Sequence, residues 1–246
     1  MSTDPNAVVL KGEDTMILTG AGRAVVLATT MMFAGTGAMA ATFNFENGNL
    51  GPNGLYDGTY AATIDGIRLE AFAGFYEQGP NPTPPDDTII DYDCSDGGCG
   101  IADREVRKTN AGLGIDGGFF DEGDVDGTIV NDLITFTFDT LVRFESVLFS
   151  RVDGDDDFDV FVDLVSPAAQ EGISIAGANP ASLLSFGPGF AISFGADDDD
   201  TLFFGDNSDD WRIAEITVSA VPLPAAGWLM LAGLGGIAGL RRRKKA

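Results

Sequence analysis

Histidine is absent from all 246 residues of the chain. Its absence excludes histidine general-base catalysis, Ser-His-Asp and Cys-His nucleophilic machinery, and histidine-ligated zinc. Cations are also scarce, with 14 Lys and Arg against 38 Asp and Glu and a net charge of −24. Residues 41–220 keep seven cations against 35 acids, a net charge of −28. Such a surface repels nucleic acid and anionic lipid, so we expect no nucleic-acid partner.

Cysteine occurs twice, as Cys94 and Cys99, separated by a segment that includes Asp96-Gly97-Gly98. Two cysteines in an oxidising compartment most simply pair, and the glycines allow the tight turn that pairing requires. We therefore expect a Cys94–Cys99 disulfide that closes a small loop and contributes about 2 kcal/mol. The spacing is not C-x-x-C, and two thiols make a poor metal site.

Helical periodicity is missing from residues 41–220, which favour short strands divided by Gly, Asn and Asp. Asp65-Gly66 indicates a hairpin turn. Residues 133–138 alternate apolar and polar positions, and a change of phase at Ser146 indicates a bulge. Further strands are expected at 158–164, 190–194, 201–204 and 211–219. The prediction is an all-β fold, a single jelly-roll-like β-sandwich with phenylalanine in its core.

Residues 78–110 differ in composition, because a proline-rich run, the cysteine loop and a charged stretch follow one another. We expect them to form a long inserted loop.

The amino-terminal residues carry the pattern of a secretory signal peptide. Arg23 precedes an apolar run at 24–33, and small residues lead to Ala38-Met39-Ala40, an A-x-A cleavage site. We expect cleavage after Ala40. The acidic residues before Met16 do not suit a signal peptide, so Met16 is the expected initiator, or else the signal carries an unusual extension.

The carboxyl-terminal residues 221–246 have three parts. The motif is Val221, Pro222, Leu223, Pro224 and Ala225; an apolar helix is expected at 225–240; and the basic stop is Arg241, Arg242, Arg243, Lys244 and Lys245. The helix has 16 residues, about 24 Å, which is short for a bilayer core. The basic stop should remain in the cytoplasm, which leaves residues 41–220 outside it.

This layout resembles the PEP-CTERM class of bacterial sorting tails, in the VPLPA-CTERM variant. The resemblance implies export through the translocon, transient anchoring in the inner membrane, and recognition by an exosortase, a membrane-embedded transpeptidase-like enzyme. The product would then reach the cell surface or the extracellular matrix. The alternative is an ordinary tail anchor that is never processed.

Acidic clusters are the remaining feature that suggests chemistry. Calcium prefers several hard oxygen ligands, and the candidate ligands are Asp153, Asp155, Asp157, Asp159, Asp124 and Asp126. Phe158 stands where an EF-hand loop needs glycine, so any calcium would bind between strands. Asp121 and Glu122 form a second acidic group with Asp124 and Asp126, and a third acidic run spans 197–200, with Asp206, Asp209 and Asp210 after it. The alternative is a solvated acidic surface without bound metal.

No catalytic constellation is recognisable, so we expect no enzyme activity. The sequence predicts a structural or adhesive surface protein, associated with exopolysaccharide or biofilm and able to bind calcium. The alternatives are a surface carbohydrate-binding module and, behind it, a carboxylate-based glycoside hydrolase.

Overall fold

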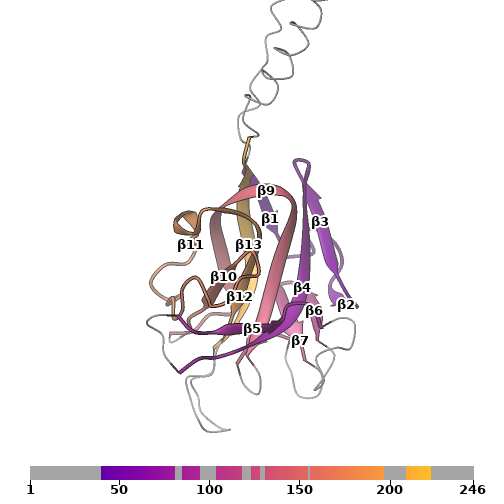
Figure 1. The fold of residues 1–246 in the computed structure, drawn as a ribbon. Helices are drawn as coiled ribbons and strands as arrows, with labels where there is room; N and C mark the ends of the chain where they lie inside the picture. Colours follow the sequence, from indigo (N-terminus) through magenta and orange to yellow (C-terminus); the bar gives the residue numbers. More distant parts are fainter. Residues whose placement is uncertain are drawn as a thin grey trace, which may run out of the picture. The chain divides into compact units, whose positions relative to one another are not determined.

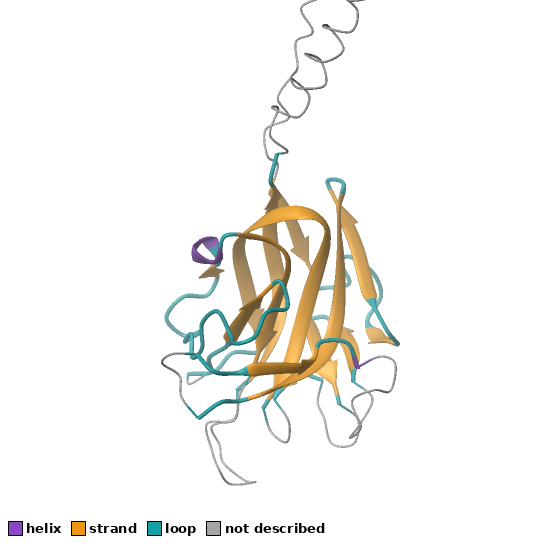
Figure 2. Ribbon diagram, in the orientation of Figure 1, coloured by secondary structure: helices purple, strands orange, loops and turns teal. Residues whose placement is uncertain are grey.

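The computed structural model describes residues 40–80, 85–94, 104–117, 123–127, 131–154, 156–196 and 209–222. All of them belong to the compact unit Thr36–Ala246. The described elements are β1 (Ala40–Asn44), β2 (Gly54–Tyr56), β3 (Tyr60–Ile64), β4 (Ile67–Glu77), β5 (Thr88–Asp91), β6 (Glu105–Thr109), β7 (Gly112–Asp116), β8 (Val125–Asp126), β9 (Asp132–Ser150), β10 (Asp159–Val162), β11 (Ala181–Ser182), the short 3₁₀ helix η2 (Leu184–Phe186), β12 (Pro188–Gly195) and β13 (Asp210–Ala220). Figure 2 shows how completely strands dominate, which confirms the all-β prediction.

The strands form one antiparallel sheet that nearly closes on itself, with the order β10-β12-β9-β13-β7-β6-β2 and with β4 on the first half of β9. β9 holds it together, because its first half pairs with β4 and β12 and its second half with β13. Between the halves the strand arches over, as Figure 1 shows. Leu133 therefore pairs with β4 and β12, whereas Phe149 pairs with β13.

Local sequence signals account for two details of the pairing. Asp65 and Gly66 both have positive φ, 50° and 81°, which makes the β3–β4 connection the predicted two-residue hairpin turn. In β9 the partner shifts between Ser146 and Phe144, leaving Glu145 without a counterpart on β13. This irregularity lies one residue from the predicted bulge.

The core is aromatic, as predicted. Phe45 stacks on Phe136 with ring centroids 6.0 Å apart, and Trp211 meets Phe149 edge-on at 5.0 Å. The indole N–H of Trp211 donates to the backbone oxygen of Asp157, which satisfies the one polar atom of this buried ring. The buried phenylalanines are Phe43, Phe45, Phe136, Phe138, Phe144, Phe149, Phe158, Phe161 and Phe194.

The predicted long loop over 78–110 is wrong in two places. Thr88–Asp91 pairs with β4, and Glu105–Thr109 pairs with β7 and β2 inside the sheet. The second strand escaped notice because Lys108 occupies an inward position, where a strand pattern calls for an apolar residue. Cys94 is buried and disulfide-bonded, as the predicted pairing requires, while Cys99 lies outside the described residues.

None of the described residues forms a helix long and apolar enough to cross a membrane. The signal segment before Ala40, the strand predicted at 201–204 and the tail from Leu223 onward lie outside the described residues.

Candidate functional site

The two ends of the described chain leave the sheet together. β1 and β13 are antiparallel neighbours, with Ala40 opposite Ser219, so the start of β1 and the end of β13 share one end of the sheet, here called the exit end. β1 begins at the residue after which cleavage is predicted. The backbone N–H of Val221 still donates to the oxygen of Leu141, 3.0 Å away. Of the predicted motif, Val221 and Pro222 are described and line a cavity of about 380 Å³ at this end.

Acidic side chains gather at the opposite end, here called the loop end, where β9 begins and ends and where β13 begins. A first cluster joins Asp153, Asp156 and Asp210, whose carboxylate oxygens lie within 4.8 Å of one another. Asp156 organises it from a buried position. One of its oxygens accepts the N–H of Asp153 at 2.5 Å and the other accepts the N–H of Asp210 at 3.2 Å.

The first cluster is electrostatically unfavourable without a cation. Burial, together with the charges of Asp156, Asp124 and Asp153, raises the pKa of Asp210 to about 6, although the charge of Arg151 opposes the shift. A carboxyl with such a pKa pays a cost for its charge at neutral pH. Closely spaced hard oxygens that repel one another fit the ligand preference of calcium, which would relieve the repulsion.

A second cluster joins Asp86, Asp87 and Glu171, again with oxygens within 4.8 Å of one another. Glu171 accepts the backbone N–H groups of both Asp86 and Asp87, at 2.7 and 3.0 Å. Burial raises the pKa of Asp87, and the charges of Glu171 and Asp86 add to it, although hydrogen bonds from Gly79 and Asp159 oppose the shift. Each cluster has one buried acid, Asp87 here and Asp156 in the first, but Asp86 and Glu171 are half-buried whereas Asp153 is exposed.

The structure does not bring the six predicted metal ligands into one site. Asp153 belongs to the first cluster. Asp159 is buried beside the second cluster, where it accepts the hydroxyl of Tyr76 at 2.7 Å. Asp124 forms ion pairs with Arg151 and Arg212.

The other three are placed elsewhere or not described. The backbone N–H of Asp157 donates to the carboxylate of Asp209, and Asp126 lies opposite Asp210 in the β8–β13 pair. Asp155 lies outside the described residues, as do 121–122 of the second predicted acidic group and 197–208 of the third. Among the residues the structure describes, each three-acid cluster therefore draws on segments far apart in sequence.

Sequence reasoning did not name Asp86, Asp87, Asp156 or Glu171 as candidate ligands, and it assigned Asp210 to the third acidic run. Adjacent acids in one loop were visible, but their partners come from other loops that meet only because the strands end together. No spacing along the chain carries that information; the sheet topology does.

No protein-family model, curated protein or solved structure matches the chain, so the function proposed below rests on its sequence and geometry alone.

Proposed function

We propose that this chain is an exported, exosortase-sorted protein of the cell surface or extracellular matrix, with a structural or adhesive role. The observation that carries the proposal is the pairing of β1 with β13. Because Ala40 and Ser219 are neighbours, a signal peptide before β1 and a sorting tail after β13 can enter the same membrane without either crossing the domain.

The short connection to the tail supports a position close to the membrane. β13 runs to Ala220, and Val221 remains hydrogen-bonded to β9, which leaves no spacer between the sheet and the motif. The ten steps from Asp210 to Ala220 span about 33 Å at the usual rise of a strand. The acidic loop end would therefore face away from the membrane, toward the medium.

Calcium binding at the loop end is part of the proposal. Both three-acid clusters lie there, and each offers carboxylate oxygens close enough to share an ion. Calcium held at such a place can bridge the domain to other anionic surface components, which suits adhesion within a matrix. Residues of the clusters would supply the ligands, and the ion would supply the charge that the surface lacks.

The fold is also proposed in finer detail. We interpret the nearly closed sheet as a jelly-roll-like sandwich whose two layers share β9, since the halves of this strand pair with different neighbours. Such a domain presents loops at its ends and a covered core between its layers.

Cell fractionation tests the sorting proposal. The full chain is compared with a variant ending at Ala220 and with the double variant Pro222→Ala, Pro224→Ala, in a host that has an exosortase and in one that lacks it. The full chain should stay in the membrane fraction without the enzyme and leave it with the enzyme. The truncated chain should leave the membrane in both hosts, and the double variant in neither. Identical behaviour of the full chain in both hosts would contradict exosortase sorting.

A further inference from the structure

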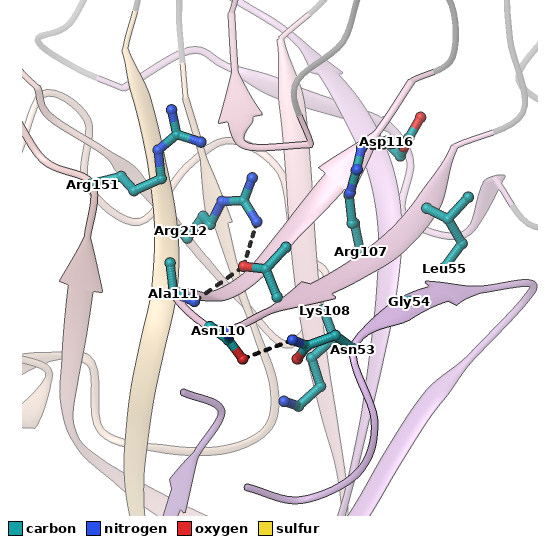
Figure 3. A pocket seen from close by; sticks show the side chains of 11 residues that line it. Asn53, Gly54, Leu55, Arg107, Lys108, Asn110, Ala111, Asp116, Arg151 and Arg212 are labelled. Carbon is teal, nitrogen blue, oxygen red and sulfur yellow. Dashed lines mark hydrogen bonds and ion pairs between the residues drawn. The ribbon is translucent and has the colours of Figure 1, made fainter. Parts of the chain in front are cut away.

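Positive charge is concentrated at one place on this acidic domain. Of the seven cations in residues 41–220, four line a single cavity of about 660 Å³. They are Arg107, Lys108, Arg151 and Arg212, and they reach it from β6, from the end of β9 and from β13, as Figure 3 shows. The volume falls in the range of roughly 300–1,000 Å³ typical of small-ligand sites.

The guanidinium groups are held in place by carboxylates. Arg212 is buried and donates to Asp124 and to the hydroxyl of Thr109, both at 2.5 Å. Asp124 also pairs with Arg151 at 3.0 Å, so one carboxylate orients two arginines. An arginine fork that is already oriented loses little entropy when it binds an anion.

Arg107 is oriented in the same way by Asp116, 2.8 Å away. Its guanidinium has five N–H donors, and Asp116 accepts from one nitrogen only. With 38% of its side chain exposed, Arg107 is open to a ligand from solvent. Asp116 and Asp124 thus hold the three arginines in place, and Arg107 keeps N–H donors that can reach a ligand.

Lys108 lines the same cavity but extends away from the arginines. Lys108 is only 1% exposed, and its ammonium has no hydrogen-bond partner among the described residues. Figure 3 shows its side chain extending from the strand on the side away from Arg107, below the amide pair of Asn53 and Asn110. Lys108 therefore adds positive charge near the cavity, while the direct contacts to an anion would come from the arginines.

The lining around the cations suits a sugar acid better than a bare ion. The amide of Asn53 donates to that of Asn110 at 2.7 Å, and Leu55, 53% exposed, adds an apolar surface. Amides can exchange hydrogen bonds with hydroxyl groups, and an aliphatic side chain can cover the C–H face of a sugar ring. Arginine binds a carboxylate with two parallel hydrogen bonds.

We propose that this cavity binds the carboxylate of an acidic sugar residue, a uronate of a polyanionic polysaccharide. The inference deepens the proposed matrix function and rests on it. Because the rest of the surface repels a polyanion, the cavity would fix one uronate at a time and leave the flanking sugars in solvent.

Isothermal titration calorimetry of the full chain in a neutral detergent tests this inference. The ligands are a short oligogalacturonate, its methyl ester, and inorganic sulfate, all with a chelator present so that calcium cannot bridge protein and sugar. The variants are Arg107→Gln and Arg151→Gln, whose side chains are partly exposed, with the exposed Arg68→Gln as the matched control. Circular dichroism confirms that each variant is folded.

The expected result is binding of oligogalacturonate that weakens about tenfold in Arg107→Gln and in Arg151→Gln and is unchanged in Arg68→Gln. The methyl ester should not bind. Equal affinity in all three variants would overturn the inference, and so would sulfate binding as tightly as the oligomer. Export and processing are measured separately by fractionation. A chain that is sorted correctly but does not bind oligogalacturonate would therefore refute this binding site and leave the sorting proposal unaffected.

Discussion

Asp210→Asn should make the domain more stable in a chelator and less stable in calcium. Burial and the nearby charges of Asp156, Asp124 and Asp153 raise the pKa of Asp210 to about 6. A carboxyl that binds its proton more tightly when folded loses stability as pH rises from its ordinary pKa to its raised one. The cost of charging Asp210 is thus absent below about pH 4 and fully present above pH 6.

The size of the effect follows from the shift. Moving a pKa from 3.8 to about 6 corresponds to about 3 kcal/mol for a fully shielded group. Asp210 is only partly buried, and solvent screening reduces this to about 1 kcal/mol. At neutral pH without metal, Asp210→Asn should therefore raise the melting temperature by about 2–4 °C.

In calcium, Asp210→Asn should lower the melting temperature instead of raising it. An ion at ten times its dissociation constant stabilises the folded state by about 1.4 kcal/mol, and the variant loses one of the ligands that would hold it. Thermal unfolding of the full chain, followed by circular dichroism in chelator, calcium and magnesium, measures both effects. The exposed Asp57→Asn is the matched control. Destabilisation by Asp210→Asn in chelator would refute the electrostatic reasoning, and an equal gain in all three media would refute the metal site.

Other substitutions test the energetic cost of buried charges and of close backbone contacts. Lys108→Met should stabilise the unliganded chain by about 1–3 kcal/mol near pH 7, because burial lowers the pKa of Lys108 and the charged form is penalised. That gain should shrink as pH rises toward 10.5, where the wild-type lysine loses its proton; a pH-independent gain in urea unfolding would argue against it. Arg212→Met should cost about 3–5 kcal/mol in the same assay, since it leaves Asp124 buried with one partner fewer, and a loss below 1 kcal/mol would contradict the ion-pair account. Gly112→Ala should cost about 1–3 kcal/mol, because its φ is 139° and the added methyl would lie 2.3 Å from a backbone oxygen of β13; Gly154→Ala, with open space around it, should be nearly neutral.

Local patterns in the sequence predicted much of the fold. Asp65-Gly66 specified its turn because positive φ at both positions is a local property. The alternation of Ile134, Phe136 and Phe138 specified which side of β9 faces the core, since the period of a strand is fixed. Both signals can be interpreted without knowing which strands pair with each other.

Long-range features could not be predicted in the same way. β6 was not predicted because Lys108 breaks the alternation of apolar and polar residues, and the sequence shows no acidic partner for its inward ammonium. Asp156 and Asp210 meet only because β13 begins beside the loop after β9. The arginine cavity likewise joins Arg107 and Arg212, which are distant in sequence, across the β6–β7 hairpin.

The central claim is that the chain is exported and then processed at both ends. Intact-mass spectrometry of the protein recovered outside the cytoplasm of a host with an exosortase tests it most directly. We predict one species that begins at Ala41 and ends within 221–225, with the basic stop and the apolar segment removed. A recovered chain that still carries Arg241–Lys245, or that retains the residues before Ala41, would contradict the account.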